Sequence, residues 1–165
     1  MVGAGTDRSR TDFGGGPAIV LVRPQLAVNI GMCARAMANF GLDDLRLVAP
    51  REGWPRIGEY HDVAYAAAAG AAHLLDGARV YASVGEAVAD LNFLYASTAR
   101  ERGQVKAVST PAAAMAATAA AMDKRGVLFG PERTGLDNDE VAIADAILTF
   151  PANPAYASLN PPRRC

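Results

Sequence analysis

Short runs of aliphatic and β-branched residues alternate with helix-like segments along most of this 165-residue chain. The first run, 18–23, is followed by a segment, 29–40, whose apolar residues recur near helical spacing. Strands that alternate with helices form mainly parallel sheets, because each helix carries the chain back across the sheet and covers one of its faces. The sequence therefore predicts one α/β domain with a mainly parallel sheet of about six strands.

The same alternation predicts where each element lies. Strands are expected at 18–23, 45–49, 79–82, 93–97, 126–129 and 147–150. Helices are expected at 29–40, 60–75, 85–91, 111–124 and 138–144. Ligands of such sheets bind beyond the carboxyl ends of the strands, so a site is expected at that edge. The chain has neither a Gly-x-Gly-x-x-Gly turn nor a P-loop, which argues against a dinucleotide or nucleoside triphosphate site.

Composition narrows the class of protein only slightly. The net charge is −1, which does not point to a nucleic-acid partner. Fourteen of the sixteen basic residues are arginine; arginine suits phosphate contacts, although a general compositional bias explains the count equally well. Two cysteines, Cys33 and Cys165, give neither a disulfide framework nor metal-ligand spacing, and a cytoplasmic location is expected. Residues 1–17 are expected to form a disordered tail without a signal sequence, and no apolar run is long enough for a membrane span.

Two segments with unusual residues follow predicted strands, and each has a plain structural interpretation. Asn29 begins a predicted helix, where its side chain could cap a free backbone N–H. Arg35 lies about 140° around that helix from Ile30, so it is expected to face solvent. The segment 130–135 could be a strand-to-helix turn, but a carboxylate in mid-loop, Glu132, is poorly suited to a core role.

Two further segments lie later in the chain. The acidic run 137–140 is expected to cap the following helix, since negative charge is favourable at a helix start. The segment 150–160, with two prolines and two asparagines, is typical of a surface loop.

The segments 29–36, 128–136 and 150–160, in this order and spacing, resemble the three signature motifs of the SpoU-type RNA ribose 2'-O-methyltransferases of the SPOUT superfamily. The resemblance covers roughly 18–160 and is closest to the bacterial subgroup that methylates a cytidine or uridine ribose in the tRNA anticodon loop. Seven consecutive matching residues, 129–135, are its most specific part. It implies a knotted α/β fold, S-adenosylmethionine as methyl donor, RNA and most simply tRNA as substrate, and a homodimer that builds each site from two subunits. It implies neither a metal nor a membrane partner.

The resemblance also assigns residues to roles. Four match the family's catalytic positions: Asn29, Arg35, Glu132 and Asn160. Eight match its cofactor-binding positions: Ser97, Thr98, Ala99, Gly130, Phe150, Ala157, Ser158 and Leu159. Four arginines are candidates for RNA contacts: Arg23, Arg100, Arg102 and Arg133. A guanidinium with a pKa above about 12 is a poor general base, so Arg35 is expected to hold a phosphate and stabilise the developing alkoxide.

The chain departs from the family after the third motif. The family continues there into a helix that completes a knot, whereas here Asn160 is followed by Pro-Pro-Arg-Arg-Cys, and two prolines with three further residues do not form a packed helix. The domain is therefore expected at 18–160 with an atypical tail at 161–165 and an incomplete knot. Two alternatives follow: a catalytically inactive remnant, and an α/β small-molecule-binding protein in which Arg35, Arg100 and Arg133 are replaceable.

Overall fold

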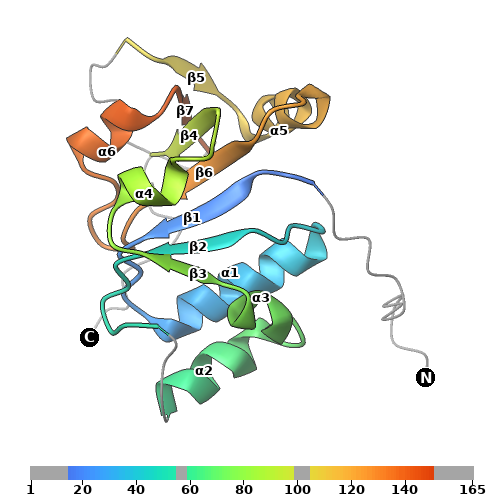
Figure 1. Ribbon diagram of the computed structural model, residues 1–165, viewed down its shortest axis with the longest axis vertical. Coiled ribbons are helices and arrows are strands. Elements are labelled where there is room, and N and C mark those ends of the chain that lie inside the picture. Colours follow the sequence, from blue (N-terminus) through green and yellow to red (C-terminus); the bar gives the residue numbers. More distant parts are fainter. Residues whose placement is uncertain (1–14, 55–58, 99–104, 151–165) are drawn as a thin grey trace.

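The fold is built on one parallel sheet of seven strands. The computed structural model describes residues 15–54, 59–98 and 105–150. The strand order across the sheet is β3-β2-β1-β6-β4-β7-β5, and every neighbouring pair is parallel (Figure 1). In chain order the strands are β1 Ala18–Val22, β2 Leu45–Val48, β3 Arg79–Tyr81, β4 Phe93–Ser97, β5 Ala107–Ser109, β6 Arg125–Phe129 and β7 Ala146–Leu148.

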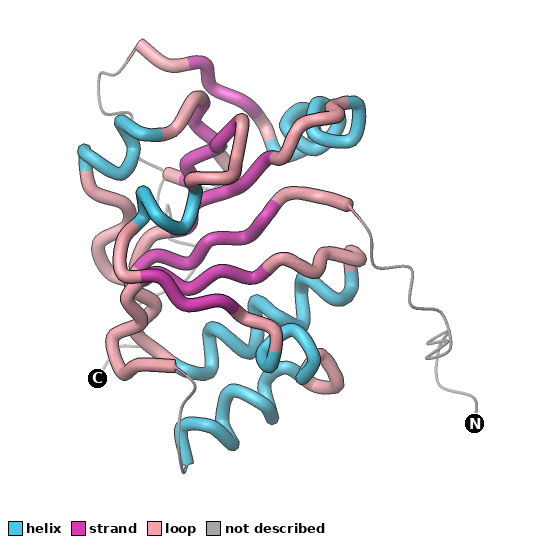
Figure 2. The backbone as a smooth tube through the Cα atoms, viewed as in Figure 1, coloured by secondary structure: helices cyan, strands magenta, loops and turns pink. Residues whose placement is uncertain are grey.

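In the described ranges six helices connect and cover these strands (Figure 2). They are α1 Ala27–Asn39, α2 Glu59–Ala68, α3 Ala72–Asp76, α4 Val84–Val88, α5 Pro111–Ala120 and α6 Asn138–Ile143. Helices α1, α2 and α3 gather on one side of β1, β2 and β3 (Figure 1). Their buried side chains join those of the strands in one core, while residues of α4 and α6 form a second core on the opposite face.

The sequence of each strand explains its place in the sheet. Strands β2 and β7 are buried along their whole length, and β1, β4 and β6 are buried at most positions. Continuous aliphatic strands of this kind belong in the interior of a parallel sheet, where helices cover both faces. The short strands β3 and β5 are mostly exposed and form the two edges.

Helices α1 and α2 approach each other very closely at Gly31. A Cβ atom placed on Gly31 would lie 2.0 Å from the carbonyl oxygen of Ala64 and 2.9 Å from Ala67 Cβ. The contact therefore requires a residue without a side chain. Because Gly31 lies two positions after Asn29, this packing fixes the part of α1 that carries the first motif.

An arginine is buried in strand β2. The side chain of Arg46 is 2% exposed, and its guanidinium donates to both Asp44 and Asp90 and to the carbonyl oxygen of Ala87. Burial by itself would lower the pKa of Arg46, but the hydrogen bonds with the two carboxylates outweigh it and raise the pKa. The same guanidinium holds the pKa of Asp90 below its usual value. The network ties β2 to the loop that follows α4.

The architecture predicted from the sequence is confirmed, with three local differences. The described sheet has seven strands, because Ala107–Ser109 pairs at the edge although it is short and mostly exposed. The predicted helix 60–75 is two helices, since Ala69 takes a φ of 46°, which no helix accommodates. The predicted helix 111–124 ends at Ala120. Residues 1–14 of the expected N-terminal tail, the expected tail 161–165 and with it the knot lie outside the described residues. Within the described part no helix is long and apolar enough to cross a membrane.

Candidate functional site

The loop after β6, from Gly130 to Leu136, is folded tightly back on itself. The backbone N–H of Gly135 donates to the carbonyl of Pro131 at 2.8 Å. A Cβ atom on Gly130 would lie 2.2 Å from the backbone nitrogen of Leu136, so the two ends of the loop touch where Gly130 stands. Leu136 is 1% exposed and anchors the loop in the core shared with α6. The loop is thus a compact unit that presents Glu132.

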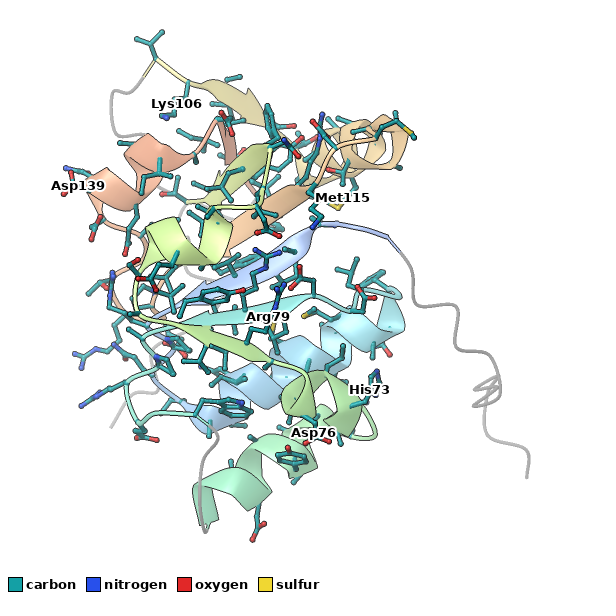
Figure 3. The ribbon with its side chains drawn as sticks, viewed as in Figure 1. His73, Asp76, Arg79, Lys106, Met115 and Asp139 are labelled. Atoms are coloured by element: carbon teal, nitrogen blue, oxygen red, sulfur yellow. The ribbon has the colours of Figure 1, made fainter. Side chains whose placement is uncertain are left out.

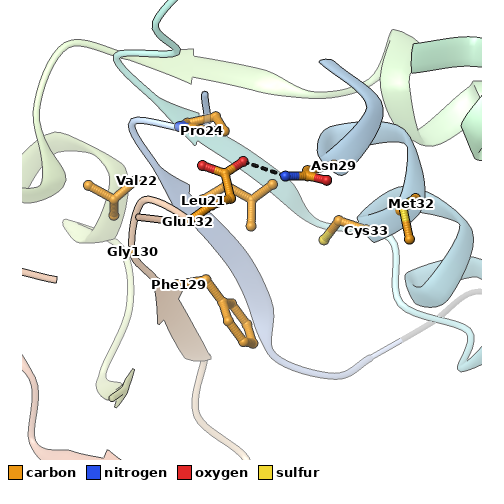
Figure 4. A pocket seen from close by; sticks show the side chains of 9 residues that line it. All are labelled: Leu21, Val22, Pro24, Asn29, Met32, Cys33, Phe129, Gly130 and Glu132. Atoms are coloured by element: carbon orange, nitrogen blue, oxygen red, sulfur yellow. Dashed lines mark hydrogen bonds between the residues drawn. The ribbon is translucent and has the colours of Figure 1, made fainter. Parts of the chain in front are cut away.

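The Glu132 carboxylate is held by the segment that follows β1. Its Oε1 accepts a hydrogen bond of 2.7 Å from Asn29 Nδ2 (Figure 4). Its Oε2 accepts one of 3.1 Å from the backbone N–H of Gln25. Residues more than a hundred positions apart in the chain, 29 and 132, therefore meet directly. This contact joins the first predicted motif to the second.

The interpretation of Asn29 as a helix cap is wrong. Helix α1 begins at Ala27 with Leu26 at the N-cap position, and no side chain caps it. Asn29 is instead the third residue of the helix, where its side chain is free to reach across to Glu132. The preference of asparagine for the N-cap position predicted a cap, but the side chain of Asn29 instead bonds Glu132, a residue distant in the sequence.

A mostly apolar pocket opens beside this contact. It has a volume of about 290 Å³, just below the usual range for small-molecule sites. Its lining residues come from β1, α1, β6 and the loops that follow β1 and β6: Leu21, Val22, Pro24, Asn29, Met32, Cys33, Phe129, Gly130 and Glu132 (Figure 4). Burial raises the pKa of the Cys33 thiol to about 11, so it remains protonated at neutral pH and is unsuited to act as a nucleophile.

Arg23 lies at the end of β1 with an unusual backbone. Its φ is 46°, in the left-handed region that non-glycine residues rarely adopt. Both terminal nitrogens of its guanidinium donate to Glu140, Nη2 to Oε2 at 3.1 Å, and Asp137 Oδ2 lies 3.8 Å from Nη2. The pKa of Arg23 is raised, chiefly by the hydrogen bond to Glu140. Asp137 and Glu140 also form the capping box of α6, which confirms the predicted cap.

Two further arginines predicted to act at the site, Arg35 and Arg133, are both exposed. Arg35 lies on the outer side of α1, as expected from its spacing, and it does not line the pocket. At 100° per residue it points about 120° away from Asn29 around the helix. Arg133 is exposed on the loop after β6, next to Glu132. The structure therefore does not bring Arg35 to Glu132 within one chain.

Predicted cofactor residues lie side by side at the carboxyl ends of three adjacent strands. Ser97, the last residue of β4, is in register with Phe129 of β6 and with Leu148 of β7. Gly130 directly follows Phe129, and Phe150, which is 37% exposed, follows β7. The backbone N–H of Thr98 donates to the carbonyl of Leu148 at 3.3 Å. The remaining predicted residues lie outside the described part of the chain: Ala99, Arg100, Arg102, Ala157, Ser158, Leu159 and Asn160.

Three features of the site were not predicted from the sequence. The backbone N–H of Gln25 donates to Glu132, and such a contact cannot be predicted from residue type because nearly every residue has a backbone N–H. Glu140 was expected only as part of a cap, and its pairing with Arg23 spans 117 positions. Cys33, whose helical spacing indicated ordinary packing, lines the pocket together with Met32. In the described ranges no group of three or more His, Cys, Asp or Glu residues is placed to hold a metal ion.

Residues 16–161 match the SpoU rRNA Methylase family. An uncharacterised tRNA/rRNA methyltransferase of Haemophilus influenzae is 37% identical over 142 residues, which cover 86% of this chain and 56% of that protein. The tRNA (cytidine/uridine/adenosine-2'-O-)-methyltransferase TrmJ of Pseudomonas aeruginosa is 34% identical over 145 residues, covering 86% of this chain and 54% of that one.

A solved structure adds the fold to this comparison. The crystal structure of TrmJ from Z. mobilis ZM4 is 54% identical, with a TM-score of 0.81 over 88% of this chain and 63% of that chain. The chain thus spans a little more than half of the length of these relatives. The match extends over nearly all of the sheet and both motif segments described above, and the chain belongs to the SpoU rRNA methylase family.

Proposed function

We propose that the chain transfers a methyl group from S-adenosylmethionine to a ribose 2'-hydroxyl of RNA, with tRNA as the substrate. The observation that carries the proposal is the hydrogen bond between Asn29 and Glu132, which brings two of the family's motif segments together beside a pocket. Relatives named as tRNA 2'-O-methyltransferases support the reaction and the substrate.

The described residues fit an adenosine-containing cofactor at the ends of β6, β4 and β7. Ser97 offers a hydroxyl, Gly130 offers backbone without a side chain, and Phe150 offers its backbone groups, all at the carboxyl ends of adjacent strands. With Thr98, Ala99, Ala157, Ser158 and Leu159 they form the proposed cofactor site. S-adenosylmethionine supplies a methyl group already activated by a positively charged sulfur, so the protein contributes mainly binding and orientation.

We assign different tasks to the four proposed catalytic residues. Glu132 is fixed by Asn29 and Gln25 and would orient polar groups of the ribose or cofactor at the pocket. Arg35 would contact the substrate phosphate and stabilise negative charge on the attacking oxygen, because its fork of donors matches phosphate geometry. Asn160 completes the set by its place in the third motif.

The exposed position of Arg35 favours a homodimer. Since Arg35 faces away from the pocket of its own chain, it would serve the site of a partner subunit. Leu26 and Met32, 54% and 58% exposed at and near the start of α1, would be covered in such an assembly.

The remaining RNA contacts are assigned to arginines. Arg133 is exposed beside Glu132, and Arg100 and Arg102 follow the proposed cofactor residue Ala99. The fourth predicted arginine, Arg23, is already bonded to Glu140, and an RNA contact by its 43% exposed side chain is the alternative to a positioning role. An enzyme that modifies tRNA would work in the cytoplasm.

The proposal is tested by incubating the purified chain with bulk tRNA and S-adenosylmethionine carrying a radioactive methyl group. Label in RNA, found on ribose after nuclease digestion and lost on catalytic substitution, would support the function. Arg35→Lys keeps the charge but loses the fork, so we expect it to lower the rate at least 10-fold. A folded chain that binds S-adenosylmethionine but labels no RNA would contradict the proposed reaction, and a chain that binds none would identify it as an inactive remnant.

A further inference from the structure

The loop 130–136, which carries Glu132, is connected to the segment 23–25 by two sets of hydrogen bonds. Glu132 in the loop accepts from the backbone N–H of Gln25, and Glu140 at the start of α6, just after the loop, accepts from Arg23. We propose that Arg23 is a positioning residue, which holds Glu132 in place by locking α6 and the loop 130–136 onto the segment 23–25. This inference rests on the proposed function for the role of Glu132, and it adds a residue that acts on the reaction through another.

The contact between Arg23 and Glu140 is rigid. The Glu140 side chain is only 7% exposed, and its carboxylate receives both terminal nitrogens of Arg23 as well as the backbone N–H of Asp137 at 2.8 Å. A forked pair of this kind fixes the relative orientation of its partners as well as their distance. The carboxylate of Glu140 is therefore bonded at once to the end of β1 and to the first turn of α6.

The loop 130–136 connects the Arg23–Glu140 contact to the Gln25–Glu132 contact. Leu136 is buried directly before Asp137, and its backbone nitrogen lies against Gly130. The Gly135-to-Pro131 hydrogen bond closes the same loop from within. A shift of the amino end of α6 would consequently be passed to Glu132, because little free chain separates the two.

A positioning role for Arg23 makes different predictions from an RNA contact. If Arg23 positions Glu132, its loss lowers the maximal rate of methyl transfer about 10–100-fold while KM for tRNA changes little, since misplacement by about 1 Å is enough for such a loss. If Arg23 mainly contacts a phosphate, its loss raises KM and reduces the salt dependence of RNA binding by about one counterion, with the maximal rate unchanged.

The variants are chosen to separate positioning from folding. Arg23→Met leaves the buried Glu140 charge without a partner and could prevent folding, so the main variant is the double substitution Arg23→Met with Glu140→Gln, which leaves no buried charge. Lys106→Met is the matched control. Lys106 (labelled in Figure 3) donates to the carbonyl oxygens of Ala142 and Ala144 at the carboxyl end of α6. Its replacement therefore also removes a cation from α6, but leaves the Arg23–Glu140 contact intact.

The deciding measurement is hydrogen exchange of the Gln25 amide, read by NMR on the full chain beside the kinetics. We expect at least 10-fold faster exchange in the Arg23/Glu140 double variant and no change in Lys106→Met, together with the loss in maximal rate. Unchanged exchange at Gln25, or an effect confined to KM and salt dependence, would overturn the proposal. If the unsubstituted chain transfers no methyl group, the proposed function fails, while the exchange measurement still decides whether Arg23 positions Glu132.

Discussion

Replacing Gly31 by alanine tests how tightly α1 is packed on α2. Alanine in the middle of a helix is normally about 1 kcal/mol better than glycine, so on an open helix surface the change would stabilise the protein. At Gly31 the new methyl would lie 2.0 Å from Ala64 O, whereas ordinary contacts begin near 3.4 Å. The obstacle is backbone, which cannot rotate aside, so the cost lies in the upper part, about 2–3 kcal/mol, of the usual range for overpacking.

The net effect on Gly31→Ala is therefore a loss of about 1–2 kcal/mol in the free energy of unfolding. For a chain of this length that corresponds to a fall in Tm of about 2–8 °C. Thermal unfolding followed by circular dichroism measures it directly. Gly85→Ala in α4 is the control, because no atom lies within 4 Å of the added Cβ and the backbone is helical.

The two substitutions should move Tm in opposite directions. We expect Gly85→Ala to raise the free energy of unfolding by up to about 1 kcal/mol, from helix propensity alone. A rise in Tm for Gly31→Ala similar to that of Gly85→Ala would refute the reasoning, because it would mean that α2 yields to the methyl group without cost.

Three further predictions follow from the site and the core. Glu132→Gln keeps the shape but removes the charge that Asn29 and Gln25 hold, so methyl transfer should fall at least 10-fold in the tRNA assay while Tm changes by only a few degrees. Gly130→Ala would place a methyl 2.2 Å from the Leu136 nitrogen, and calorimetric titration should show S-adenosylmethionine affinity reduced at least 10-fold. The pKa of Asp90 is lowered mainly by its hydrogen bond from Arg46. The carboxylate therefore stabilises the folded chain above pH about 4, and this contribution is lost as the pH falls below that value. The Tm difference between the unsubstituted chain and Asp90→Asn should be largest near pH 7 and shrink below pH 4. A difference that stays constant down to pH 2 would contradict that assignment.

The sequence predicted those parts of the fold that depend on local patterns. Buried strands such as β4 were predicted residue by residue because every position in them is apolar or small. The edge strand β5 was missed because an edge needs little burial, and its sequence, Ala-Val-Ser, has no pattern of its own. The division of 60–75 into two helices was missed for a related reason: alanine is the best helix former, yet Ala69 is the residue that leaves the helix.

The candidate site shows where local reasoning stops. The cap at Asp137 could be predicted because its partner, Glu140, lies three residues away. The partners of Asn29 and Arg23 lie 103 and 117 positions away, and nothing near either residue indicates them. The motif resemblance grouped Asn29 and Glu132 in one catalytic site, but only the folded chain shows the hydrogen bond that joins them.

Glu132 is held by hydrogen bonds from two groups of the protein itself, the side chain of Asn29 and the backbone N–H of Gln25. Donors that are in place before a substrate arrives need no rearrangement during the reaction, and such preorganisation is the main source of electrostatic catalysis. One of these donors belongs to α1, whose position depends on the contact of Gly31 with α2. A glycine without any chemical group should therefore influence activity: if Gly31→Ala shifts α1, the Asn29–Glu132 bond lengthens, and the rate should fall by more than the loss of folded protein explains.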